Sequence, residues 1–125
     1  MKQFLLFFVL LSLLLTGCGN DSSIRKELYD DSLKYYNLLN ERIMAIETYT
    51  EEDKKNLKAY DGKYTAMLND LSKEERILAA EIISMSRSLE IIKEVYLILD
   101  KKDYKDTVED FVRSKLEAAK ILGLE

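Results

Sequence analysis

Residues 71–99 read LSKEERILAAEIISMSRSLEIIKEVYLIL, and this stretch decides the fold. Its apolar residues alternate at intervals of four and three, which places them on one face of an α-helix. The residues on that face are Leu78, Ile82, Met85, Leu89, Ile92, Tyr96 and Leu99, and the face is widened by Ile83, Ile91, Val95 and Ile98. This is the most apolar helix that the chain predicts, and we expect it to form the centre of the core.

The segment before it predicts a second helix with a weaker pattern. Thr50 precedes Glu51-Glu52-Asp53, which is typical of an N-cap followed by acid in the first turn. The apolar positions that follow are Leu57, Tyr60, Tyr64, Met67 and Leu71. Ser72 and Glu75 form the S-x-x-E capping box that marks the start of the third helix. Because the apolar spacing nearly continues across Ser72, one helix over residues 51–99 is the alternative.

Two further helices are predicted, one on each side of this region. From residue 24 to about residue 48, a single stripe carries Ile24, Leu28, Tyr35, Leu39, Ile43 and Ile46. Residues 100–103 read as a polar connector, and Asp106 as the N-cap of the last helix. The expected apolar side of that helix is Val108, Val112, Leu116, Ala119 and Leu122, with Phe111 beside them. Gly123 suits the left-handed conformation that ends many helices.

These patterns predict an all-α fold, a small bundle of three or four amphipathic helices over residues 24–125. The chain has no proline, the residue that most strongly breaks helices. No stretch beyond the N-terminus shows the sustained alternation of period two that is typical of strands. With 125 residues in all, we expect one domain.

The N-terminus predicts a signal peptide. An apolar run at residues 4–15 follows Lys2 and precedes small residues, as in the h-region of a secretory signal. As a helix, twelve residues reach about 18 Å, short of the roughly 30 Å hydrocarbon core of a bilayer. A permanent transmembrane helix is the alternative interpretation of this run.

The residues Leu15-Thr16-Gly17-Cys18 closely resemble the lipobox of bacterial lipoprotein precursors. The resemblance covers residues 1–18 only. It implies transfer of a diacylglyceryl group to the Cys18 sulfur and cleavage between Gly17 and Cys18. Residues 1–17 would then be the signal peptide, residues 18–23 the lipidated cysteine with a short tether, and residues 24–125 the helical bundle. An ordinary secretory signal with a chance cysteine is the alternative.

The short tether predicts where the mature protein works. Gly19-Asn20-Asp21-Ser22-Ser23 spans at most about 17 Å even when fully extended. We therefore expect the bundle to lie close to the outer, extracytoplasmic face of the cytoplasmic membrane. The sequence leaves open whether one or two membranes surround the cell.

Composition bounds the chemistry of the mature part. The chain has no histidine, the usual general base and the commonest metal ligand, and its single cysteine is Cys18. We therefore expect no enzyme activity, no cofactor and no metal. A net charge of −4 with mixed signs disfavours a nucleic-acid partner, which requires a basic face.

Tyr35 and Tyr36 are the candidate interface residues. Adjacent residues on a helix point about 100° apart, so we expect at least one of the two rings to face outward. Tyrosine makes a good interface anchor because it buries a large area and keeps a polar tip. The acidic clusters Glu51-Glu52-Asp53 and Glu74-Glu75 are better explained by helix-start chemistry than by a cation site.

The expected function is that of a membrane-anchored lipoprotein whose helical module binds a membrane or surface protein. Two alternatives stay open. One is an exclusion or immunity lipoprotein of a mobile element, which would block conjugative transfer or phage entry. The other is a small ligand-binding lipoprotein, which would require a cavity of several hundred cubic ångström between the helices. A homo-oligomer is also possible, because the third helix has enough apolar width to pair with a second copy.

Overall fold

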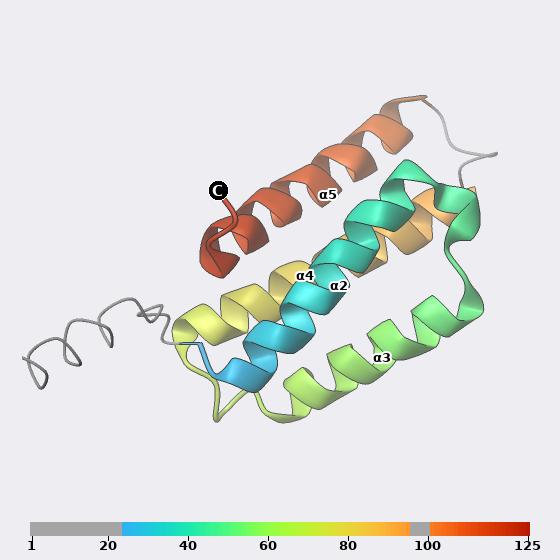
Figure 1. Ribbon diagram of the computed structural model, residues 1–125. Coiled ribbons are helices and arrows are strands. Elements are labelled where there is room, and N and C mark those ends of the chain that lie inside the picture. Colours follow the sequence, from blue (N-terminus) through green and yellow to red (C-terminus); the bar gives the residue numbers. More distant parts are fainter. Residues whose placement is uncertain (1–23, 96–100) are drawn as a thin grey trace, which may run out of the picture.

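The computed structural model describes residues 24–95 and 101–125, and within these ranges it contains helices and no strand (Figure 1). The elements are α2 (Lys26–Met44), the 3-10 turn η1 (Ile46–Thr48), α3 (Glu51–Ala66), α4 (Lys73–Val95) and α5 (Lys101–Leu122). The all-α bundle predicted from the sequence is confirmed. The signal peptide, the lipobox and the tether lie outside the described residues.

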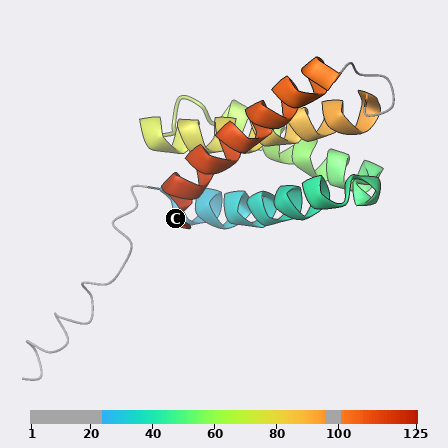
Figure 2. The same cartoon turned by 90° about the horizontal axis from the view of Figure 1, so that it is seen from above.

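Helix α4 forms the centre of the core, as predicted. Figure 1 shows α2 in front of it, with α3 and α5 on opposite sides, and Figure 2 shows α5 crossing the other helices obliquely. The described members of the predicted face are all buried, namely Leu78, Ile82, Met85, Leu89 and Ile92. Tyr96 and Leu99, the last two members, lie outside the described residues. A helix surrounded on three sides requires a wide apolar face, and the added width at Ile83 packs against the core, whereas Ile91, predicted to widen the same face, is exposed.

Helices α3 and α4 are separate, so the alternative of one continuous helix is wrong. Both predicted caps are formed. At the start of α4, the Ser72 amide donates to the Glu75 carboxylate at 2.8 Å, and the Glu75 amide donates to the Ser72 hydroxyl at 3.2 Å. At the start of α3, Thr50 and Asp53 make the same reciprocal pair at 3.0 and 3.1 Å. The side chains of Ser72 and Glu75 satisfy amides that a continuing helix would have bonded to its own carbonyls.

The first predicted helix divides near its end. It runs as α2 to Met44, and its expected last turn is the 3-10 turn η1 after a break at Ala45. The buried face of α2 consists of Leu28, Ser32, Tyr36 and Leu39. Ile24, which precedes the helix, is also buried, so the first described residue is already packed in the core.

The start predicted for the last helix is wrong. Helix α5 begins at Lys101, so Asp106 lies inside it and not at its N-cap. The Thr107 hydroxyl donates to the Asp103 carbonyl at 2.9 Å, one turn earlier, which is a bond made within a helix that is already formed. Residues 101–103 of the expected connector are therefore helical.

The face predicted for α5 is also partly wrong. Val112 and Leu116, expected in the core, are 45% and 55% exposed. The buried stripe is Phe111, Ser114, Ala118, Ala119 and Leu122. Small residues at positions 114 and 118 let α5 approach α4 closely, and the two helices are tied by a 3.0 Å hydrogen bond from Ser114 to Ser84. Rotation of α5 toward these small residues turns Val112 and Leu116 outward.

The predicted end of α5 is confirmed. Gly123 has a φ of 71°, in the left-handed region that favours glycine. The Leu124 amide donates to the Ala119 carbonyl at 2.9 Å, which is the long hydrogen bond of a Schellman cap.

Candidate functional site

Gly17 and Cys18, the predicted cleavage and modification site, lie outside the described residues. Tyr35 and Tyr36 are described, and neither is fully exposed. Tyr36 is buried, and Tyr35 is half-buried with its ring edge-on to Tyr60 at 5.2 Å between centroids. Tyr35 is thus the ring of the pair that keeps some exposure, although α3 covers part of the side of α2 that carries it. Their role as an interface stays a prediction.

Tyrosines on α3 join α2 through their hydroxyl groups. Tyr60 and Ser32 share a buried hydrogen bond of 2.7 Å, and the Tyr64 hydroxyl donates to Asp31 at 2.6 Å. Lys63 donates to the same Asp31 carboxylate at 2.8 Å. Burial alone would raise the pKa of Asp31, but the hydrogen bonds from Lys63 and Tyr64 outweigh it and lower that pKa. Burial also raises the pKa of Tyr60, and it raises that of Tyr64 to about 12, so both phenols stay protonated donors near neutral pH.

Arg25 joins the start of α2 to the start of α4. Its backbone amide and its Nε atom donate to the same Glu75 oxygen at 2.8 and 2.9 Å, and its Nη2 atom reaches the Asp70 carbonyl at 2.6 Å. The Glu75 side chain is almost fully buried. The hydrogen bond from Arg25 lowers the pKa of Glu75 to about 2, against the opposing effect of burial. We call this set of contacts the Arg25–Glu75 clamp.

Arg42, in the last turn of α2, makes the matching contact at the opposite end of that helix. The Arg42 Nε atom donates to Asp53 at 2.9 Å, and Asp53 completes the capping box of α3 with the N-cap residue Thr50. Burial would raise the pKa of Asp53, but the hydrogen bonds from Arg42 and Thr50 lower it. Each capping carboxylate therefore serves its own helix and also holds α2. Helix-start chemistry, as predicted, explains the acidic residues at 53 and 75.

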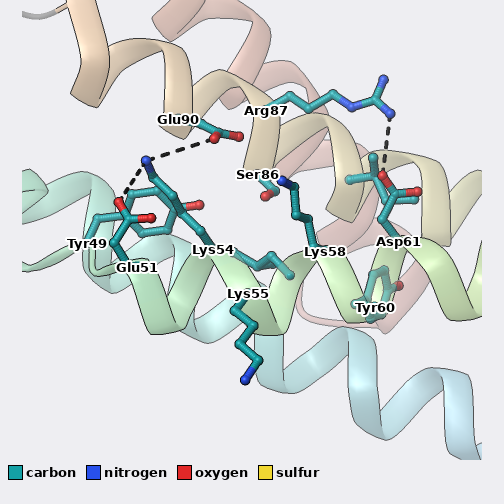
Figure 3. Close-up of a pocket in the computed structure, with 12 residues that line it drawn as sticks. Tyr49, Glu51, Lys54, Lys55, Lys58, Tyr60, Asp61, Ser86, Arg87 and Glu90 are labelled. Atoms are coloured by element: carbon teal, nitrogen blue, oxygen red, sulfur yellow. Dashed lines mark hydrogen bonds and ion pairs between the residues drawn. The ribbon is translucent and has the colours of Figure 1, made fainter.

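A groove of about 410 Å³ lies between α3 and α4 (Figure 3). Its apolar lining is Tyr49, Leu57, Tyr60 and Ile83. Charged pairs cross it at both ends. Lys54 on α3 lies 3.4 Å from Glu94 and 4.0 Å from Glu90, both on α4, and Arg87 on α4 lies 3.5 Å from Asp61.

The groove is suited to binding more than to acid–base chemistry. Its carboxylates at Glu51 and Asp61 are paired with Lys54 and Arg87. Burial raises the pKa of Tyr49, against a hydrogen bond with Ser86, so this phenol also stays protonated near neutral pH. A half-open apolar floor between charged walls can hold an amphipathic molecule or a peptide segment.

An apolar ridge runs along the outer side of α5. Val112 and Leu116 project from α5 into solvent. Together with Ile77 of α4, they border a depression of about 610 Å³. The charged residues around this depression are Glu81, Glu109, Arg113 and Glu117. Apolar side chains with a charged border are typical of the centre and rim of a protein interface. We call Ile77, Val112 and Leu116 the α5 ridge.

Sequence reasoning missed the two arginine contacts and the ridge for different reasons. Arg25 and Arg42 give no local signal, because their partners are fixed only when helices from different parts of the chain meet. The ridge was assigned to the core because valine and leucine at helical spacing usually lie there. The small residues Ser114 and Ala118 were the available signal, since they mark a side of α5 that a neighbouring helix can approach closely.

Within residues 24–95 and 101–125, no cluster of three or more acidic, histidine or cysteine side chains could hold a metal ion. In the same part of the chain, no helix combines the length and apolar character needed to cross a bilayer. A comparison with protein-family models found no matching family. Comparisons with curated proteins and with solved structures found no match either.

Proposed function

We propose that the chain is the precursor of a bacterial lipoprotein whose mature domain is a non-catalytic interaction module. Leu15-Thr16-Gly17-Cys18, placed directly after an apolar run, is the observation that carries the proposal. Two acyl chains on Cys18 give a stable membrane anchor, which a single chain does not. The bundle then binds a membrane or surface protein at the outer face of the cytoplasmic membrane.

Two features of the bundle support this function. Its first described residue, Ile24, is already buried, so little chain separates Cys18 from the folded domain. The α5 ridge also exposes apolar surface on a helix that is packed firmly against α4. Because the ridge stands on packed helices, it would itself lose little conformational entropy when a partner binds.

The anchor is tested by Cys18→Ser in the full-length chain, with Ser23→Ala as the matched control. We expect the wild type and the control to lose residues 1–17, to gain the mass of a diacylglyceryl group, and to sediment with membranes. Cys18→Ser should keep its signal peptide and lack the lipid mass, since serine has no thiol to accept the group. A serine variant that is still cleaved and lipidated would refute the proposal.

The partner is tested by cross-linking in intact cells, followed by pull-down from gently solubilised membranes. The wild type and Glu52→Lys, an exposed change on α3, should recover the same protein. A double variant, Val112→Lys with Leu116→Lys, should lose it while keeping its helical content. Recovery of nothing beyond the lipoprotein-processing enzymes would argue against an interaction module. If the double variant recovers the same protein as the wild type does, the interface lies elsewhere than on the α5 ridge.

A ligand-binding lipoprotein is the second candidate, favoured by the groove between α3 and α4. Its volume of about 410 Å³ falls within the range of small-molecule sites. Mass spectrometry of protein purified from membranes should detect a compound that co-purifies with the wild type. Ser86→Tyr, which fills the groove, should lose the compound, and Glu117→Tyr, outside the groove, should retain it. Absence of a co-purified compound from the wild type would remove this candidate.

A further inference from the structure

Four chain segments meet at one end of the bundle. Helices α2 and α4 begin there, and α3 and α5 end there, as both views show (Figures 1 and 2). The Arg25–Glu75 clamp ties the start of α2 to the turn between α3 and α4. The Tyr29 hydroxyl donates to the Leu122 carbonyl at 3.2 Å and ties α2 to the end of α5. This end is therefore a fixed surface, and we call it the chain-entrance end.

Two large apolar side chains are exposed at the chain-entrance end. Leu68, in the turn after α3, is 43% exposed, and Leu124, just after α5, is 46% exposed. Neither side chain belongs to the buried core. Exposed leucines at the ends of helices are suited to contact the boundary between lipid headgroups and acyl chains, where apolar surface leaves water.

The length and position of the tether bring this end to the bilayer. Five residues separate Cys18 from Ile24, and they span at most about 17 Å. The 23 residues of α4 make a helix about 35 Å long, so the opposite end of an upright bundle lies beyond that reach. The Arg25–Glu75 clamp fixes the point where the tether leaves the bundle. The chain-entrance end is then held nearest to the lipid.

We propose that the chain-entrance end rests on the lipid surface, with Leu68 and Leu124 in contact with the bilayer. This inference rests on the proposed anchor at Cys18. The charges at this end have mixed signs, with Lys73 and Glu74 at the start of α4, Lys120 in the last turn of α5 and Glu125 after that helix. The contact therefore depends on the anchor and the leucines, and it does not require anionic lipid. An upright bundle leaves the α5 ridge and the opposite end open to a protein partner.

Single tryptophans can test this orientation, because the chain has none of its own. Leu68→Trp and Leu124→Trp place a probe at the chain-entrance end. Met44→Trp, at an 86% exposed position of the opposite end, and Leu116→Trp, on the α5 ridge, are the matched controls. Each lipidated, mature protein is reconstituted into neutral phosphatidylcholine vesicles whose acyl chains carry bromine, which quenches nearby tryptophan.

We expect the emission of Leu68→Trp and Leu124→Trp to fall at least twofold relative to unbrominated vesicles, with a blue shift. Emission from Met44→Trp and Leu116→Trp should stay unchanged. Strongest quenching at position 116 would mean that the bundle lies on its side, and quenching at none of the four would mean that it stands clear of the lipid. Either result overturns the proposed orientation.

A further experiment distinguishes failure of the proposed orientation from failure of the proposed lipid anchor. The mature protein without lipid, made as residues 18–125 with Cys18→Ser and Leu68→Trp, lacks the apolar signal peptide and should fail to bind the vesicles. If it fails to bind while lipidated Leu68→Trp binds without quenching, the anchor stands and the orientation is wrong. If the serine variant binds the vesicles as well as the lipidated protein does, the proposed lipoprotein function is wrong.

Discussion

The Glu75 carboxylate accepts hydrogen bonds from both the backbone and the guanidinium of Arg25, a residue 50 positions earlier in the chain. The same carboxylate caps α4 through the Ser72 amide. One buried side chain thus satisfies the start of two helices. Because a buried carboxylate without partners is costly, these contacts make Glu75 the most sensitive polar position at this end of the bundle.

Glu75→Gln should destabilise the bundle markedly. The amide keeps the shape of the side chain but cannot accept charge-assisted hydrogen bonds from Arg25 at both oxygens. We expect the free energy of unfolding to fall by about 2 kcal/mol, in the range for hydrogen bonds to charged groups. Urea unfolding of residues 19–125, followed by circular dichroism, measures it. Glu117→Gln, an exposed change on α5, is the control and should shift the midpoint little. Equal effects of the two changes would show that the clamp contributes nothing.

The clamp also predicts how stability depends on pH. The pKa of Glu75 falls from its ordinary 4.5 to about 2 in the folded protein, mainly because Arg25 donates to it. A carboxyl group with a lowered pKa stabilises the fold above its unfolded pKa, and that stabilisation is lost as the pH falls toward the folded pKa. The stability difference between wild type and Glu75→Gln should therefore be constant above about pH 5 and shrink between about pH 4.5 and 2. Urea titrations at pH 7, 5, 4 and 3 measure it, and a difference that stays constant to pH 3 would contradict this assignment.

The buried pair of Tyr60 and Ser32 predicts a coupled effect between α2 and α3. Tyr60→Phe leaves the Ser32 hydroxyl without its partner, and Ser32→Ala does the same to the Tyr60 hydroxyl. Each single change should cost about 1–2 kcal/mol, because it strands a buried polar group. The double variant should cost clearly less than the sum, since it removes both groups together. Unfolding free energies of the four proteins test this, and strictly additive effects would mean that the two hydroxyls do not interact.

Local sequence signals predicted much of the fold. The caps at Thr50 and Ser72, the left-handed Gly123 and the apolar face of α4 each depend on residues within one or two turns of one another. Such signals act before distant segments meet, so they can be read from the chain directly.

Contacts between distant segments could not be predicted in the same way. Arg25 with Glu75, and Arg42 with Asp53, form only after α2 has packed on the helices that follow it. The exposure of the candidate interface residue Tyr35 could not be predicted for the same reason. The ring of Tyr35 packs against Tyr60 because α3 folds back over α2, which the sequence of α2 alone does not show.

Helix α5 shows most clearly that the sequence of one helix does not determine which of its sides is buried. Its apolar residues cover more of its circumference than one neighbour can bury, so several rotations satisfied the pattern equally well. The structure selects the rotation in which Ser114 meets Ser84 and Ala118 is fully buried. Close approach of backbones at small residues thus overrode the burial of two larger side chains, and Val112 and Leu116 were left outside.

This rotation makes a direct prediction from a matched pair of residues on α5. Phe111 is 1% exposed and Leu116 is 55% exposed, although the sequence assigns both to the apolar side. Phe111→Ala removes a fully buried ring and should lower the free energy of unfolding by about 3–5 kcal/mol. Leu116→Ala removes a side chain that is already mostly in water, and should change it by about 0.5 kcal/mol or less. Urea unfolding of residues 19–125 measures both. A large loss for Leu116→Ala, with a small one for Phe111→Ala, would mean that α5 packs with its other face inward, and the α5 ridge would then be part of the core and unable to bind a partner.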